Sequence, residues 1–114
     1  MMSKNILLDT NFILTCLKQK IDFFEEFYLV GINVIIPENV ISEIEKLKKT
    51  AALKLLEQNE FKKITLPGKN VDNAIVKFAK ENPEIIIATL DQTMRKKIRN
   101  KKATIRNKKT IEIV

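Results

Sequence analysis

Short apolar runs alternate along this chain with stretches of helical spacing, and this alternation restricts the fold more than any other feature. The expected strands span residues 5–8, 33–36, 61–66, 84–90, 103–106 and 110–114. Apolar residues at intervals of three and four predict helices over residues 11–18, 22–28, 37–48, 51–58, 71–80 and 92–100. Strands that alternate with helices form a parallel sheet covered on both faces. The sequence therefore predicts an α/β fold: one three-layer α/β/α domain, residues 1–114, around a parallel sheet of about five strands.

The composition excludes several kinds of chemistry. The chain has no histidine, which removes Ser-His-Asp and Cys-His catalysis and most zinc sites. Its single cysteine, Cys16, has no partner for an internal disulfide, which favours a reducing cytoplasm. No secretory leader is visible, and no apolar run approaches the roughly 20 residues of a membrane span. Catalysis would therefore depend on carboxylates, lysines, hydroxyls or a metal held by oxygen.

Two aspartates each follow an expected strand. Asp9 ends the apolar run in KNILLDTNFIL, and Asp91 ends the one in IIIATLD. In α/β sheets, sites form beyond the carboxyl ends of the strands, where the strand order reverses. Two more acids lie on helices, Asp72 at the start of VDNAIV and Glu43 at the edge of the apolar stripe in VISEIEKL. These four positions make one shared acidic site a hypothesis.

Each acid also has an ordinary structural explanation. Asp9 and Asp91 could cap the helices that follow them, and Asp72 suits the first turn of its helix. Helical spacing places Glu45 about as far from the stripe's centre as Glu43, so periodicity does not choose between them, and a solvated ion pair is the default for either. However, two like charges 4 Å apart repel by about 4 kcal/mol at an effective dielectric near 20. Converging carboxylates would therefore need a cation, and an all-oxygen cluster favours Mg²⁺ or Mn²⁺ over zinc.

Four segments, in order, resemble the PIN-domain endoribonucleases along nearly the whole chain. They are LLDTNFIL, VIIPENVISEIEKL, VDNAIVKFA and IIIATLDQTMRKKIR. The resemblance places the family's catalytic and metal-binding acids on Asp9, Glu43, Asp72 and Asp91. It implies that these residues bind Mg²⁺ or Mn²⁺ and hydrolyse RNA, with Thr10, Asn11 and Thr89 supporting them through hydrogen bonds.

Two branches of this family compete. The ending TLDQTMRKKIRNKKATIRNKKTIEIV is similar to members that process ribosomal RNA in the small-subunit processome, and we favour that branch. One departure is that Asp72 is followed by Asn73, where that branch often has paired acids. The alternative is a VapC-type toxin, which cuts tRNA or rRNA and dimerises. The partners implied are RNA with a ribosome-assembly factor, an antitoxin or a second copy of the chain, and no membrane.

The C-terminal third is strongly basic. Nine of the fifteen residues from Arg95 to Lys109 are Lys or Arg, and the whole chain carries a net charge of +7. Most charge runs are solvated helix faces and tails. The alternative, which we favour, is phosphate contact near Asp91. The expected RNA-binding residues are Arg95, Lys96, Lys97, Arg99, Lys101 and Lys102. No aromatic residue is interleaved among them, so base stacking by this segment is not expected.

Two further hypotheses concern the acidic and basic residues, and a third concerns the aromatic residues. A receiver-like switch domain also gathers carboxylates at strand ends, but it would need adjacent acids where Asp9 is followed by Thr10. A basic RNA-binding scaffold without activity would use the acids only as helix caps. The aromatic cluster of Phe23, Phe24, Phe27 and Tyr28 is expected in the core, with a dimer surface as the alternative.

Overall fold

The computed structural model describes residues 4–114, so residues 1–3 of the expected domain lie outside the described part. Within that part, six strands form one sheet: β1 Lys4–Leu8, β2 Ile32–Pro37, β3 Lys62–Ile64, β4 Ile86–Ala88, β5 Lys102–Arg106 and β6 Thr110–Ile113. The helices are α1 Thr10–Lys18, α2 Phe23–Leu29, α3 Glu38–Lys46, α4 Thr50–Glu57, α5 Val71–Glu81 and α6 Gln92–Lys97. The strand order is β3-β2-β1-β4-β5-β6, and every neighbouring pair is parallel except β5 and β6.

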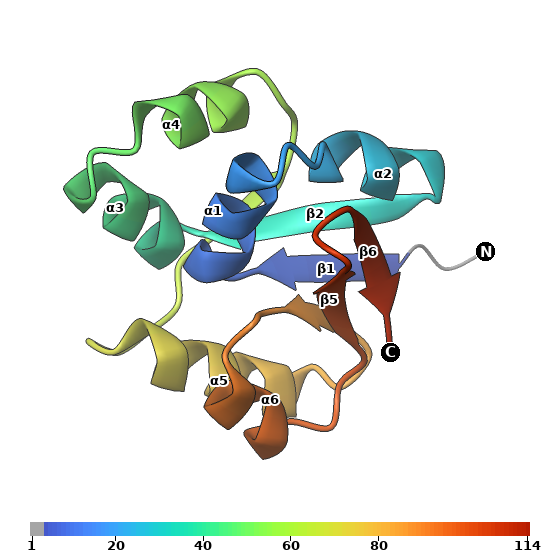
Figure 1. Cartoon of the computed structure of the whole chain (residues 1–114). Helices are drawn as coiled ribbons and strands as arrows, with labels where there is room; N and C mark the ends of the chain where they lie inside the picture. The colour runs from blue at the N-terminus through green and yellow to red at the C-terminus, as the bar shows by residue number, and fades with distance from the viewer. Residues whose placement is uncertain (1–3) are drawn as a thin grey trace.

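The helices cover the sheet on both sides, so the predicted three-layer arrangement is confirmed. Figure 1 shows α1 to α4 on one face and α5 with α6 on the other. The side chains of Ile6, Leu7 and Leu8 in β1 are fully buried, as expected for a central strand covered on both faces. None of the helices in residues 4–114 is long and apolar enough to cross a bilayer.

Local sequence signals set most helix ends. Asp22 accepts a hydrogen bond from the amide of Glu25 at the start of α2, and Asn70 accepts one from Asn73 at the start of α5. Helix α3 ends in a tight turn in which the amides of Lys48 and Lys49 donate to carbonyls of the last helical turn. Lys48 has a φ of +56°, a left-handed conformation that glycine usually supplies at this position.

The aromatic cluster belongs mainly to the core, as predicted. Phe23 is fully buried, and its ring packs edge-on against Phe12 at a centroid distance of 6.4 Å. Phe24 and Phe27 are also buried. The prediction that Tyr28 lies on the same apolar face is wrong. Tyr28 is 82% exposed because it lies on the outer side of the last turn of α2.

The structure differs from the expected elements at the C-terminal end of the chain. All six expected strands join the sheet, but β6 is antiparallel because Asn107 and Lys108, both with positive φ, turn the chain back on β5. Helix α6 stops at Lys97 instead of continuing to Asn100. The reason is tertiary: Ile98 is extended and buried, and the side-chain amide of the buried Asn100 donates to the carbonyls of Asn82 and Ile85 in the loop after α5.

Candidate active site

Asp9 and Asp91 meet where the strand order reverses. The chain builds the sheet outward from β1 through β2 to β3, then returns to the other side of β1 with β4. Asp9 directly follows β1, and Asp91 lies three residues beyond the end of β4. The amide of Asp9 donates to the Ala88 carbonyl at 2.9 Å, which keeps the two strand ends in register past the last paired residues. The two aspartates therefore lie at the predicted switch point.

Thr89 connects the two aspartates. Its hydroxyl donates to Oδ2 of Asp9 at 3.0 Å and accepts a hydrogen bond from the Asp91 amide at 3.2 Å. Thr89 is fully buried, so both bonds are shielded from water. Asn11, from the first turn of α1, adds a second link because its Oδ1 accepts from the Leu90 amide at 3.4 Å. The turn that carries Asp91 is thus fixed to the turn that carries Asp9.

Both aspartates also cap helices, so the ordinary structural explanation holds for them as well. Oδ1 of Asp9 accepts from the Thr10 amide at 2.8 Å. Oδ1 of Asp91 accepts from the amides of Thr93 and Met94, at 2.9 and 3.2 Å. These bonds fix the direction of each carboxylate. Within residues 4–114, Oδ2 of Asp91 receives no hydrogen bond, so capping leaves one oxygen free for another ligand.

The environment of Asp9 opposes its negative charge. The side chain is buried, and this burial is the main reason why the pKa of Asp9 rises from its ordinary 3.8 to about 6. The hydrogen bonds from Thr10 and Thr89 act in the opposite direction. The charges of Asp72 and Glu43 raise the pKa further, which shows that both lie within electrostatic reach of Asp9.

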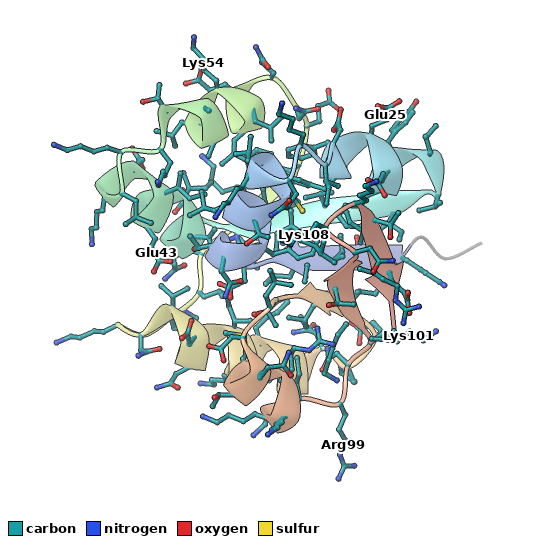
Figure 2. The ribbon with its side chains drawn as sticks, in the orientation of Figure 1. Glu25, Glu43, Lys54, Arg99, Lys101 and Lys108 are labelled. Atoms are coloured by element: carbon teal, nitrogen blue, oxygen red, sulfur yellow. The ribbon has the colours of Figure 1, made fainter. Side chains whose placement is uncertain are left out.

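Asp72 and Glu43 complete the acidic cluster. The pKa of Asp72 is raised by partial desolvation and then by the charges of Asp91 and Glu43, while Lys97 lowers it. Asp72, Asp91 and Lys97 line a small hollow of about 130 Å³ between α5 and α6. Glu43 is half-buried on α3, at the side of the sheet where β1 ends (Figure 2), whereas Glu45 is exposed. The structure therefore distinguishes the two glutamates that helical spacing left equivalent.

The donor set suits a hard divalent cation. All four side chains offer carboxylate oxygen, the ligand that Mg²⁺ and Mn²⁺ prefer, and their mutual repulsion would be relieved by a positive ion. Among residues 4–114, no three acidic or thiol side chains are already placed to ligate one ion. The residues fit such an ion in chemical type and in charge.

The supporting residues act differently from one another. Thr89 donates to the Asp9 carboxylate, whereas Asn11 accepts from the Leu90 amide rather than donating to a carboxylate. Thr10 contributes its backbone amide, whereas its buried hydroxyl has no hydrogen-bond partner among residues 4–114. Arg95, expected to contact RNA, is half-buried and donates to the backbone carbonyls of Thr89 and Ala103, at 3.1 and 3.5 Å. A role for Arg95 in positioning Thr89 was missed by the sequence argument, because only the folded chain brings those carbonyls to its guanidinium.

The structure divides the expected RNA-binding segment. Lys97 lies beside the acids, and the adjacent Lys96 is exposed. Lys102 pairs with Ile87 in the middle of β4, so Lys101 and Lys102 lie at strand positions several residues before the acidic end. Figure 2 accordingly shows Lys101 and Arg99 away from Glu43. The ammonium of Lys102 also donates to the Asn100 carbonyl at 2.8 Å. Arg99, Lys101 and Lys102 are therefore not brought together with the acids.

The lone cysteine is not part of this site. Cys16 is buried in the core, and this burial, with a smaller effect of the Glu26 charge, raises the pKa of its thiol to about 12. A thiol that stays protonated at neutral pH is a poor nucleophile. The chemistry of the site therefore rests on its carboxylates.

Comparisons with known proteins agree with this geometry. The family model described as "PIN like domain" matches residues 6–108. The rRNA-processing protein fcf1 of Schizosaccharomyces pombe is 32% identical over 102 residues, which cover 83% of this chain and 53% of that protein. The Ribonuclease VapC4 of Methanocaldococcus jannaschii is 29% identical over 121 residues and 92% of both chains.

A solved structure gives the same result for the fold. The PIN domain endonuclease Utp24 superposes with a TM-score of 0.83 at 28% sequence identity, over 96% of this chain and 90% of that one. The chain spans about half the length of the fcf1 relative. The residues matched by the family model include all four acids, the last three residues of β1 and the whole of β4. This chain belongs to the family of PIN-like domains.

Proposed function

We propose that this protein is a metal-dependent endoribonuclease that hydrolyses phosphodiester bonds of RNA, with ribosomal RNA precursors as its substrates. The observation that carries the proposal is the hydrogen-bonded link from Asp9 through Thr89 to Asp91 at the switch point, with Glu43 and Asp72 within electrostatic reach. A set of helix caps alone would have no reason to gather four carboxylates at one sheet edge.

We propose Asp9, Glu43, Asp72 and Asp91 as the residues that hold one or more Mg²⁺ or Mn²⁺ ions. When bound, such an ion lowers the pKa of a water molecule and neutralises charge on a phosphate. The protein's own contribution is placement. The Thr89 hydroxyl and the Thr10 amide fix the direction of the Asp9 carboxylate, and two amides of α6 fix that of Asp91. Above a pH of about 6, Asp9 presents a charged oxygen.

Lys97 is the cation best placed to contact the substrate near the acids. It lines the same hollow as Asp72 and Asp91, and its side chain is exposed. A lysine there can bind a phosphate oxygen and partly offset the negative potential that repels RNA. We keep Lys96 as its neighbour in this role, whereas Arg95 serves the backbone.

A direct test is incubation of the purified protein with total RNA and Mn²⁺, followed by mapping of the new RNA ends. We expect cleavage by the wild type and none by Asp91→Asn. Asparagine caps helices as well as aspartate does, so this variant should keep its fold. Asp22→Asn, at the exposed cap of α2, is the matched control and should cleave like the wild type. Equal cleavage by Asp91→Asn and wild type would refute the proposal.

A second candidate function is that of a VapC-type toxin ribonuclease. It is favoured by one observation: the VapC4 relative matches this chain over 92% of both lengths, whereas the fcf1 relative is about twice as long. The mapped ends separate the two candidates. Cuts confined to ribosomal RNA precursors support processing, and cuts in mature tRNA or rRNA support the toxin. A toxin should also arrest growth when expressed alone.

A further inference from the structure

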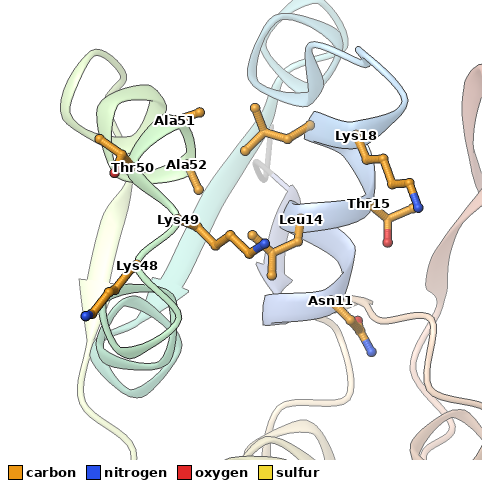
Figure 3. Close-up of a pocket in the computed structure, with 10 residues that line it drawn as sticks. Asn11, Leu14, Thr15, Lys18, Lys48, Lys49, Thr50, Ala51 and Ala52 are labelled. Atoms are coloured by element: carbon orange, nitrogen blue, oxygen red, sulfur yellow. The ribbon is translucent and has the colours of Figure 1, made fainter.

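A groove of about 550 Å³ lies between α1 and the start of α4, next to the acidic site (Figure 3). Its floor is apolar and is formed by Leu14, Leu17 and Ala52. Three lysines border it: Lys18 on α1, and Lys48 and Lys49 on the turn before α4. We call it the lysine groove. Its volume is in the range of sites that hold small organic molecules.

The groove begins at the acidic site. Asn11 lines its end, and the same residue accepts the hydrogen bond from the Leu90 amide beside Asp91. Asn11 is also only two residues after Asp9. Asn11 therefore belongs both to the lining of the groove and to the hydrogen bonds beside the aspartates.

The charges of the groove suit a polyanion. No acidic residue lines it. Within residues 4–114 the only ion pair is that of Arg106 with Glu112, so all three lysines are without a carboxylate partner. Figure 3 shows Lys49 extending from its turn toward Leu14 on α1. Because a substrate phosphate is repelled by the acids, cations just beyond them would supply the compensating attraction.

The backbone at Lys48 makes a glycine variant informative. Lys48 occupies the left-handed position that ends α3, where glycine avoids the steric cost of a side chain. A lysine at such a position costs about 1 kcal/mol relative to glycine.

From this geometry, and resting on the proposed function, we propose that the lysine groove holds the unpaired stretch of RNA that flanks the scissile phosphate. The three lysines would contact its phosphates, and the apolar floor would pack against base or ribose. The proposal therefore adds Lys18, Lys48 and Lys49 to the RNA-binding residues.

The test measures the binding of a labelled 12-nucleotide oligouridylate by fluorescence anisotropy. EDTA is present so that no cleavage occurs. For single strands the salt slope falls by about 0.7 per phosphate contact, which corresponds to about fivefold in affinity per contact at 0.1 M salt. We expect Lys48→Gln with Lys49→Gln to weaken binding about 25-fold and to flatten the slope by about 1.4. Lys54→Gln, which removes an exposed lysine of α4 that does not line the groove, is the matched control.

Lys48→Gly separates binding from folding. Because glycine relieves the left-handed strain, this variant should be more stable than the wild type in urea and yet bind RNA about fivefold more weakly. A misfolded variant would lose both. Unchanged affinity of Lys48→Gly and of the double variant would overturn the proposal. A second result would also overturn the proposal. If the lysine variants bound RNA like the wild type but bound a polyglutamate peptide more weakly, the groove would be a site for an acidic protein segment.

The outcome is distinguishable from failure of the proposed function. If Asp91→Asn abolishes cleavage and the lysine variants bind like the wild type, the enzyme proposal stands and the groove proposal fails. If the lysine variants lose RNA binding while the wild type cleaves nothing, the groove is an RNA site on a protein that is not a nuclease.

Discussion

Replacing Asp9 with asparagine should stabilise this protein while removing its activity. The pKa of Asp9 is about 6 in the folded chain and 3.8 in its ordinary state, a difference of about two units, or about 3 kcal/mol. The folded chain therefore holds this proton more tightly than the unfolded chain. The corresponding stability is fully present below pH 3.8 and is lost as the pH rises to about 6. Asparagine does not ionise and avoids this loss.

The measurable quantity is the difference in the free energy of unfolding between Asp9→Asn and the wild type, in urea with EDTA. We expect this difference to widen in favour of the variant by about 2–3 kcal/mol between pH 4 and pH 7. The asparagine can still accept from the Thr10 amide, so the helix cap is preserved. Asp22→Asn, an exposed cap, should change the stability by less than about 0.5 kcal/mol at neutral pH. A difference that stays constant from pH 4 to pH 7 would refute the argument.

A divalent cation should reduce the stability advantage of Asp9→Asn over the wild type. An ion that binds only the folded wild type stabilises it by mass action, and Asp9→Asn lacks one of the proposed ligands. At pH 7, added Mn²⁺ should therefore raise the midpoint of urea unfolding of the wild type and have less effect on the variant. Equal shifts for both proteins would mean that Asp9 does not contact the ion.

Three further predictions concern single residues. Thr89→Val removes the hydroxyl that donates to Asp9, so the acidic limb of the pH–rate profile for RNA cleavage should move to higher pH. Asn100→Ala removes the side-chain donor of the buried Ile85 carbonyl and one of the two donors of the Asn82 carbonyl, and should lower the free energy of unfolding by about 1–3 kcal/mol in urea. Phe23→Ala opens a cavity in the aromatic core and should cost about 3–5 kcal/mol by the same measurement, and a loss below 1 kcal/mol would contradict its central place.

The layers of the fold could be predicted because each strand and helix carries its own local pattern. The run before Asp9 is apolar throughout, and β1 is buried on both faces as that pattern requires. The ends of the elements were less predictable. The strand expected over residues 84–90 pairs only at Ile86–Ala88, because a turn occupies residues 83–85 before it. The position of Asn100 depends on carbonyls 15 and 18 residues earlier, which no local pattern reports.

The candidate site could likewise be predicted only in part from the sequence. The place of Asp9 and Asp91 follows from one topological rule, since both come after neighbouring parallel strands. Glu43 could not be separated from Glu45 by helical spacing, and only the packing of α3 beside α1 places it near the aspartates. The lysine groove was not predicted at all. Its lysines come from two helix-flanking segments about thirty residues apart, while the sequence drew attention to the denser basic run near the C-terminus.

The strand order has a consequence for the time at which activity appears during synthesis. Strands β1, β2 and β3 are adjacent in the sheet and consecutive in the chain, so they can pair before the remainder has been made. The partner that brings Thr89 and Asp91 to Asp9 is β4, which joins β1 from the other side only after most of the chain has left the ribosome. A nascent chain would therefore carry Asp9 and Glu43 before Thr89 and Asp91 are in place, so the proposed metal site would stay incomplete until β4 pairs with β1.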